Sequence, residues 1–339
     1  MLITKKTLFM TTKAIDNLFK NIENKNVLII GDVMVDAYLM GSVDRISPEA
    51  PVPVVSVEGR RSRMGGAANV ALNISALGAT PFLCSVIGSD ARGDEFVELM
   101  AKRKMSDKGI VRSKSRPTTT KFRVIGNNVQ MLRVDEEVVY FINRHEEKAL
   151  LSKITDIIND ENIDAIIFED YDKGSISPNL IRAVVKIAKK KKIIVTVDPK
   201  KRNFKSFSNL TLLKPNFKEL KEGCDLDIEN GDIPAIRDAA MALLRENNLE
   251  ILMVTLSEHG MLICERNLQT HIPAIVRSIA DVSGAGDTVI SVLTLALASG
   301  ISAVEAAKLS NLAGGLVCEE VGVAPIDKKK LKLEAGSIL

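Results

Sequence analysis

Short apolar runs rich in β-branched residues recur along this 339-residue chain, and stretches with helical periodicity separate them. This alternation predicts a mostly parallel sheet covered by helices on both faces. Ligands of such sheets bind beyond the carboxyl ends of the strands, so the residues after each strand are the first candidates for a site. The predicted strands cover 26–33, 82–88, 165–170, 192–198, 210–215 and 251–256, and the predicted helices cover 66–77, 94–105, 145–160, 178–190 and 232–247.

Two further segments, 51–60 and 118–135, have the character of strands but lack a crossover helix beside them. The second contains Gly126-Asn127-Asn128 between two alternating runs, a pattern typical of a β-hairpin. We therefore expect a small antiparallel flap that projects from the main sheet. The alternative is a place at the edge of that sheet.

Composition limits the classes of function. The 46 basic and 43 acidic residues leave a formal charge of +3, which argues against a surface dedicated to nucleic acid. The four cysteines are scattered, as expected of free thiols in a reducing compartment. No apolar run is long enough to cross a bilayer and no signal-peptide core stands out, so we expect a cytoplasmic protein with no membrane partner.

The strongest local motif is Asp281–Thr288, with the sequence DVSGAGDT, which precedes an apolar stretch at helical spacing. Gly284, Ala285 and Gly286 would leave backbone N–H groups open to an anion at the helix start, where the helix dipole adds to the attraction. Asp287 could take a proton from an attacking hydroxyl, and phosphoryl transfer needs both features. The alternative is a close-packed helix start in which Asp287 only complements the dipole.

The first predicted helix also starts with small residues. Gly65 and Gly66 permit a close approach of the backbone to a ligand, and Asn69 can donate and accept hydrogen bonds, which suits a polyol. Asp32 and Asp36 follow the first strand, where carboxylates could accept from sugar hydroxyls. Helix packing, turns and caps are the alternative roles. Neither glycine cluster has the placement of a dinucleotide fingerprint or the lysine of a P-loop, which disfavours an NAD oxidoreductase.

Five motifs occur in one order along residues 26–325, and together they resemble the ribokinase-like (PfkB) carbohydrate kinases. The resemblance implies an α/β fold, a three-layer αβα sandwich with a mostly parallel sheet and a small antiparallel lid. It also implies a single kinase domain over 1–339, with lid segments near 34–60 and 115–135. The motifs are Asp32, Gly65-Gly66-Ala67-Ala68-Asn69, Asn216-Phe217-Lys218-Glu219, Val254–Gly260 and Asp281–Asp287.

By this resemblance Asp287 is the catalytic base, and the N–H groups of Gly284, Ala285 and Gly286 form an anion hole for the γ-phosphoryl group of ATP. Asn216 and Glu219 would organise Mg²⁺ through water, because Mg²⁺ keeps several waters in such sites. A helix cap is the alternative for this pair. Asp281 could hold a monovalent cation such as K⁺. The residues implied to bind ATP are Asn216, Phe217, Lys218, Glu219, Thr255, Ser257, Gly260, Asn311 and Gly314.

Two parts of the implied nucleotide site leave alternatives open. Ser257 stands where the commoner family pattern has glycine, which puts the local path of the backbone in question. Asn311 and Gly314 could instead belong to a small-residue face of a core helix.

The stretch 31–55, and Arg45–Val54 most of all, resembles the family members that phosphorylate a heptose phosphate. This implies ATP-dependent phosphorylation of D-glycero-β-D-manno-heptose 7-phosphate at its C1 hydroxyl, which supplies heptose 1,7-bisphosphate for ADP-heptose and lipopolysaccharide core synthesis. The alternatives are a related kinase for another sugar or sugar phosphate, such as fructose 6-phosphate, and a nucleotide- or sugar-binding regulator without catalysis.

The resemblance also assigns the sugar contacts and a partner. The lid would close over the sugar, exclude water, and pair two subunits into a homodimer. None of the three histidines forms an HxGH motif, so we expect no C-terminal adenylyltransferase domain. The residues implied to hold sugar hydroxyls are Asp32, Asp36, Gly65, Gly66 and Asn69, and the candidates for the remote phosphate are Arg45, Arg133, Lys173 and Lys200.

Overall fold

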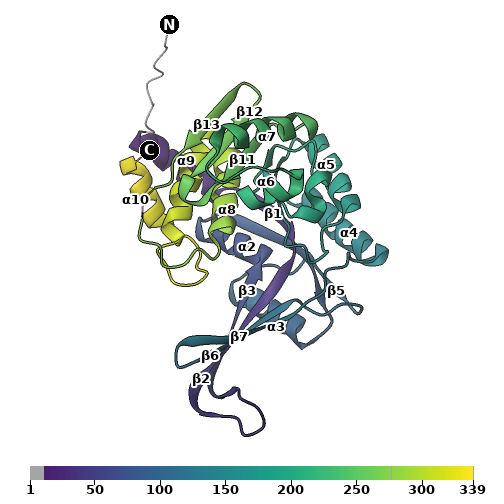
Figure 1. The fold of residues 1–339 in the computed structure, drawn as a ribbon. Helices are drawn as coiled ribbons and strands as arrows, with labels where there is room; N and C mark the ends of the chain where they lie inside the picture. Colours follow the sequence, from purple (N-terminus) through teal and green to yellow (C-terminus); the bar gives the residue numbers. More distant parts are fainter. Residues whose placement is uncertain (1–10, 276, 339) are drawn as a thin grey trace.

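The computed structural model describes residues 11–275 and 277–338, and its centre is a nine-stranded sheet (Figure 1). The strands are β1 (Asn26–Gly31), β4 (Thr80–Gly88), β5 (Ile110–Ser113), β8 (Ala165–Glu169), β9 (Ile194–Asp198), β10 (Leu212–Leu213), β11 (Ile251–Thr255), β12 (Met261–Glu265) and β13 (Leu268–Ile272). Their order is β13-β12-β11-β10-β9-β8-β1-β4-β5. All neighbours from β11 to β5 pair in parallel, and β12 and β13 add an antiparallel edge. The predicted mostly parallel sheet is confirmed.

Helices cover both faces of this sheet and make the fold a three-layer sandwich. They are α1 (Thr12–Glu23), α2 (Ala67–Ala76), α3 (Ala91–Lys102), α4 (Arg144–Asp160), α5 (Pro178–Lys191), α6 (Phe217–Cys224), α7 (Ile233–Glu246), α8 (Ala285–Ala298), α9 (Ala303–Val317) and α10 (Lys328–Ile338). Val27 and Ile29 of β1 pack into one half of the core with α2, α8 and α9, and Leu28 and Ile30 pack into the other with α4, α5 and α7. A strand buried on both faces must be apolar at every position, which explains the continuous runs. Within the described residues, no helix combines the length and apolarity that crossing a membrane requires.

A second sheet projects from the first and forms the lid (Figure 1). It consists of β2 (Val33–Ile46), β3 (Pro53–Gly66), β6 (Thr120–Gly126) and β7 (Val129–Glu136), in the order β3-β2-β6-β7. β2 pairs antiparallel with β3, and β6 with β7, while a parallel pairing of β2 with β6 joins the two pairs. The lid is therefore a sheet of its own, and the alternative placement at the edge of the main sheet is wrong.

The predicted hairpin turn joins β6 to β7. Asn127 and Asn128 have φ angles of 49° and 64°, in the left-handed region that two-residue hairpin turns require. The Asn127 side chain also accepts from the N–H of Val43 and donates to its carbonyl oxygen, both at 3.1 Å. This turn is thereby tied to β2, and the two halves of the lid are held together near its tip.

Candidate active site

The start of α8 has backbone N–H groups without helical partners, and its role as an anion hole stays a prediction. Gly284 caps the helix with a φ of 81°, a left-handed conformation that favours glycine. The first N–H to form an α-helical bond is that of Thr288, which donates to the carbonyl oxygen of Gly284 at 3.0 Å. Of the N–H groups before it, that of Ala285 donates to the carbonyl oxygen of Val282 at 3.3 Å, whereas those of Gly284 and Gly286 have no backbone partner among the described residues. Gly286 is exposed, so this turn is accessible.

The Asp287 side chain lies at the same helix start and is only 4% exposed. The Tyr171 hydroxyl donates to its Oδ1 at 2.7 Å, whereas Oδ2 is buried without a hydrogen-bond partner among the described residues. Burial raises the pKa of Asp287 to about 6, although the hydrogen bond from Tyr171 opposes the shift. A carboxylate with this pKa can accept a proton near neutral pH.

Asp287 belongs to a buried cluster, which we call the charged floor, made of Glu169, Asp198, Lys214 and Asp287. Glu169 and Asp198 are aligned in register at the carboxyl ends of β8 and β9, and Lys214 follows β10. The Lys214 Nζ lies 2.6 Å from Asp198 Oδ2. Burial raises the pKa of Glu169, and the charges of Asp198 and Asp287 raise it further. The floor therefore lies beyond the strand ends, where ligands of such sheets bind.

Sequence reasoning missed Glu169, Asp198 and Lys214 as site residues. Each is a charged residue at the end of a buried apolar run, which is the signal that could have found them. A Cβ on Gly286 would lie 3.6 Å from Asp198 Oδ2 and 4.0 Å from Lys214 Nζ, so this ion pair faces the start of α8. The arrangement puts a buried cation beside the proposed anion hole.

Asn216 and Glu219 form a reciprocal cap at the start of α6. The Asn216 Oδ1 accepts from the N–H of Glu219, and a Glu219 carboxylate oxygen accepts from the N–H of Asn216, both at 2.8 Å. The pair therefore caps α6, and its role toward Mg²⁺ stays a prediction. Glu219 also accepts from Lys200, so its carboxylate faces a cation at the floor rather than solvent. Lys218 is 80% exposed and lies 3.8 Å from Glu222, and Phe217 is half-buried.

Two other residues predicted to bind the nucleotide, Thr255 and Asn311, lie at or near the carboxyl ends of β11 and β13. Thr255 forms an isolated β-bridge with Asn216, which joins the end of β11 to the start of α6. Asn311 in α9 donates to the carbonyl oxygen of Pro273, directly after β13, at 2.9 Å. Two pairs of segments that are distant in sequence thus meet at the ends of β11 and β13.

Three further positions of the predicted nucleotide site have clear backbone or packing reasons for their residue type. Ser257 has a φ of 52°, so it takes the left-handed path that glycine would take, at a cost of about 1–2 kcal/mol. Gly260 has a φ of 82°, and a Cβ there would collide with the carbonyl oxygen of Ile272. A Cβ on Gly314 would lie 2.8 Å from the Val289 side chain, so Gly314 allows α9 to pack closely on α8, in agreement with the packing alternative.

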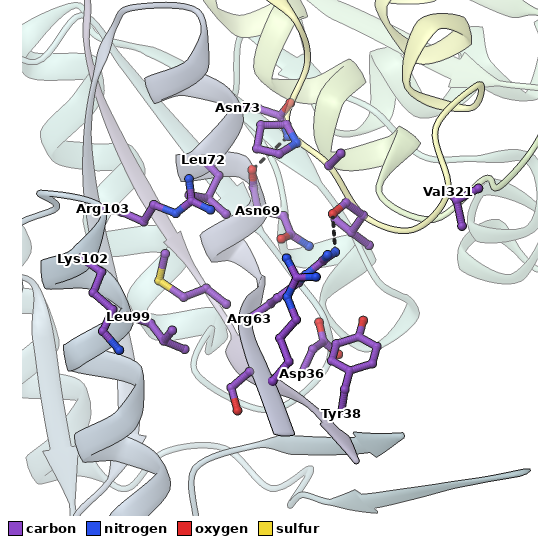
Figure 2. Close-up of a pocket in the computed structure, with 16 residues that line it drawn as sticks. Asp36, Tyr38, Arg63, Asn69, Leu72, Asn73, Leu99, Lys102, Arg103 and Val321 are labelled. Atoms are coloured by element: carbon purple, nitrogen blue, oxygen red, sulfur yellow. Dashed lines mark hydrogen bonds between the residues drawn. The ribbon is translucent and has the colours of Figure 1, made fainter. Parts of the chain in front are cut away.

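A cavity of about 500 Å³ lies between the base of the lid, α2, α3 and the loop 321–325, and we call it the lid cavity (Figure 2). Asp36 and Asn69 line it, and Arg123 of β6 pairs with Asp36. A Cβ on Gly65 would lie 2.5 Å from Asp36 Oδ2, so glycine keeps room for this carboxylate. Asn69 also lies beside Asp287, and it links the cavity to the charged floor.

Four cations line the lid cavity: Arg61 and Arg63 from β3, and Lys102 and Arg103 from the end of α3. None of the four forms an ion pair with a carboxylate within residues 11–275 and 277–338. Arg63 donates to the carbonyl oxygen of Val323 at 3.2 Å, a bond drawn in Figure 2. The sequence analysis missed this group, although the run of basic residues at 60–63 precedes the predicted glycine pair. Unpaired cations around one cavity favour an anionic ligand.

Asp32 has a different role from Asp36. Its buried carboxylate accepts from the backbone N–H groups of Tyr171, Lys173 and Ser175, at 3.1, 3.0 and 2.8 Å. It thereby holds the loop after β8, and it does not line the lid cavity. Gly66 has a φ of 63° at the start of α2, where a left-handed residue joins β3 to the helix.

The structure does not bring the cations predicted for the remote phosphate to the lid cavity. The Lys173 Nζ pairs with Glu137 at 2.8 Å, and Lys200 lies at the charged floor beside Glu219. Arg133 is 54% exposed on β7, the outer strand of the lid, and Arg45 is exposed near the tip of β2. The four predicted cations therefore lie apart from the four cations that line the lid cavity.

Asp281 connects the loop before α8 to the loop after α9. Its carboxylate accepts from the N–H groups of Ser283 and Gly322, at 2.9 and 3.1 Å, and these bonds hold the pKa of Asp281 below its usual value. The part of the chain that the structure describes contains no group of three or more His, Cys, Asp or Glu side chains suited to a metal. A K⁺ ion at Asp281 stays a prediction.

Comparison with known proteins places this geometry in a family. The pfkB family of carbohydrate kinases matches residues 24–330. The protein named Bifunctional protein HldE of Methylobacillus flagellatus is 40% identical over 311 residues, which are 92% of this chain and 63% of that protein. The same-named protein of Helicobacter pylori is 37% identical over 310 residues, 91% of this chain and 66% of that protein. The chain thus spans just under two-thirds of the length of these relatives.

Solved structures of similar fold agree with the family match. The phosphofructokinase-2 of Escherichia coli in complex with potassium has a TM-score of 0.74 at 19% identity, over 92% of this chain and 99% of that one. The ribokinase of Arabidopsis thaliana complexed with ribose and ATP has a TM-score of 0.69 at 16% identity, over 93% and 100%. The chain belongs to the pfkB family of carbohydrate kinases, and it is a sugar kinase.

Proposed function

We propose that this kinase transfers the γ-phosphoryl group of ATP to the C1 hydroxyl of D-glycero-β-D-manno-heptose 7-phosphate. The observation that carries the proposal is the lid cavity, whose four unpaired cations could hold a phosphate while Asn69 joins it to Asp287. A sugar phosphate would then reach the base with its far end held at the cations. The similarity to proteins named HldE supports a heptose as the sugar.

The proposed chemistry uses groups of the charged floor. Asp287 takes the proton of the C1 hydroxyl, and the C1 oxygen attacks the γ-phosphorus in line with the departing ADP. The N–H groups of Gly284, Ala285 and Gly286 bind the phosphoryl oxygens, and the buried cation of Lys214 lies near enough to draw the γ-phosphate toward them. Asp36 and Asn69 accept or donate hydrogen bonds to the sugar hydroxyls.

The donor set near ATP fits a divalent cation bound through water. Glu219 supplies one buried carboxylate and Asn216 an amide oxygen beside it, and since these oxygens already accept from Lys200 and from backbone N–H groups, they would reach Mg²⁺ only through water. Such a set suits Mg²⁺, which is commonly bound through one or two carboxylates and keeps several waters. When bound, Mg²⁺ would neutralise charge on the phosphates of ATP.

We further propose that two subunits pair through their lids, in the cytoplasm. β7 is an edge strand with all eight residues exposed, and its apolar Val129, Leu132 and Val134 are 61%, 56% and 47% exposed. A long exposed apolar edge is a feature that native proteins usually cover. The four cysteines are free thiols, in keeping with a reducing compartment.

The test is phosphorus NMR of the protein with ATP, Mg²⁺ and a panel of sugar phosphates. A new anomeric phosphate signal on heptose 7-phosphate, with ADP formed in equal amount, supports the proposal. Phosphorylation of fructose 6-phosphate or another sugar phosphate, with none of the heptose, would reject the heptose assignment. It would leave the sugar kinase assignment intact.

A further inference from the structure

Tyr171 joins the loop after β8 to the carboxylate at the start of α8. Its hydroxyl donates to Asp287 Oδ1 at 2.7 Å, and the Asn69 side chain also lies near this carboxylate and favours its charged form. The second oxygen, Oδ2, is buried and has no partner among those residues. The two carboxylate oxygens of Asp287 therefore differ: Oδ1 accepts a hydrogen bond from Tyr171, and Oδ2 has no hydrogen bond among the described residues.

The backbone of Tyr171 is held as firmly as its hydroxyl. Its N–H donates to Asp32 Oδ2 at 3.1 Å, and Asp32, itself 1% exposed, also holds the N–H groups of Lys173 and Ser175. On the side of the floor, the Lys200 Nζ lies 5.8 Å from the centre of the Tyr171 ring. A side chain fixed at backbone and hydroxyl can fix the carboxylate that it contacts.

We propose that Tyr171 is a positioning residue, which holds Asp287 through Oδ1 and leaves Oδ2 as the atom that receives the proton of the sugar hydroxyl. In this step the O–H bond of the sugar breaks and its proton moves to Oδ2. The sugar oxygen bonds to the γ-phosphorus, and the bond from that phosphorus to ADP breaks with its electron pair going to ADP. The inference rests on the proposed role of Asp287 as the base, and it does not depend on which sugar is the substrate.

The ionisation of both groups agrees with these roles. Burial is the main cause of the raised pKa of Asp287, and the charge of Asp198 raises it further. Hydrogen bonds from Tyr171 and Asn69 and the charge of Lys214 oppose the rise. Glu169 also interacts electrostatically with Asp287. Burial and the carboxylate of Asp287 raise the pKa of Tyr171, so the phenol keeps its proton and remains a donor.

The test is Tyr171→Phe, assayed with whichever sugar phosphate the wild type phosphorylates. We expect kcat to fall about tenfold to a hundredfold, because a hydrogen bond to a charged group is lost, while KM for both substrates changes less than about threefold. Since Tyr171 favours the charged form of Asp287, the acidic limb of the kcat profile should also move to higher pH. Tyr140→Phe is the matched control, because the half-exposed Tyr140 donates only to the carbonyl oxygen of Ser115, outside the site.

Two results would overturn the inference. One is a kcat within twofold of wild type, and the other is a reduced kcat whose acidic limb has not moved, since loss of packing alone would not change the pKa of the base. As a second measurement, Tyr171→Phe in an Asp287→Asn background should lower the residual turnover no further, because the tyrosine acts through that carboxylate. If the wild type phosphorylates another sugar phosphate but not the heptose, the proposed substrate is wrong. The role of Tyr171 can then still be tested with the sugar phosphate that is phosphorylated.

Discussion

The two long strands of the lid, β2 and β3, are buried at one end and exposed at the other. Val33–Ala37 and Met64–Gly66 are buried at the base, whereas Asp44–Ile46 and Pro53 are exposed at the tip. The base touches α2 and the lid cavity, and the tip projects away from the main sheet (Figure 1). One pair of strands thus serves as wall of the site and as projecting surface, and its two ends should respond differently to substitution.

The ion pairs differ in the same way. Lys214 and Asp198 at the charged floor have side chains 3% and 8% exposed, whereas Lys121 and Asp135 in the lid are 17% and 24% exposed. Removing one partner of a buried pair costs about 3–5 kcal/mol, and an exposed pair contributes about 0–1 kcal/mol. The difference indicates that the floor is fixed by charge and the lid mainly by its backbone pairing.

The largest effect is expected at the floor, from Asp287→Asn. The amide keeps the shape but cannot accept the proton, so kcat should fall by about 10²–10⁴ while ATP affinity stays within about threefold. In the wild type, activity should rise with pH through about 6, because Asp287 must lose its proton to act as a base. Steady-state rates across pH 5–8 and ATP titration calorimetry measure these outcomes.

The matched control is Asp238→Asn on α7, where the side chain is 80% exposed and remote from the floor. It should leave kcat unchanged. A turnover of Asp287→Asn within tenfold of wild type would remove Asp287 from the role of base, and the floor would then be a structural cluster only.

A smaller effect is expected at the wall of the cavity, from Arg63→Ala. If Arg63 binds the remote phosphate, KM for the sugar phosphate should rise about tenfold to a hundredfold, since a charge-assisted hydrogen bond is lost, with little change in KM for ATP. Initial rates at varied concentrations of each substrate separate the two. Arg182→Ala on the exposed side of α5 is the control. Equal changes in both KM values would argue against a phosphate contact at Arg63.

Much of the fold of the main sheet and the lid could be predicted from the sequence, because it depends on local patterns. The apolar runs predict the parallel sheet, Gly126-Asn127-Asn128 predicts the turn, and the glycine-rich motif predicts the open start of α8. What could not be predicted depends on tertiary contacts. Arg61 and Lys102 meet at one cavity although they come from a strand and a helix, and no spacing in the sequence reports that meeting.

The two aspartates after the first strand show the same limit. Asp32 and Asp36 look alike in the sequence, since both follow a buried apolar run. The chain leaves the main sheet between them, so Asp32 turns to the loop after β8 and Asp36 reaches the cavity. Which carboxylate meets a ligand is decided by where β1 ends and β2 begins, and a pattern locates such boundaries poorly.

Two glycines of β3 allow the comparison to be tested within one strand. A Cβ at Gly65 would lie 2.5 Å from Asp36 Oδ2, whereas a Cβ at Gly59 would meet Met40 at an ordinary 3.5 Å. Gly65→Ala should therefore lower the free energy of unfolding by about 1–3 kcal/mol, the usual cost of overpacking, and Gly59→Ala should change it by less than about 1 kcal/mol. Urea unfolding measures both. Equal effects would show that the base and the middle of β3 are not packed differently.

The smallest effect on chemistry is expected at the outer strand of the lid, from Leu132→Glu. If two lids pair, a charge at a covered position must lose its hydration, so the dimer should weaken at least tenfold in sedimentation velocity. Leu333→Glu is the control, because Leu333 is 74% exposed on α10, outside the lid. Since Leu132 is remote from the charged floor in the chain fold, kcat should stay within about threefold. A wild type that sediments as a monomer at every concentration would reject the paired lids. A monomeric Leu132→Glu variant with kcat lost entirely would instead show that pairing through the outer strand of the lid completes the site of the partner subunit.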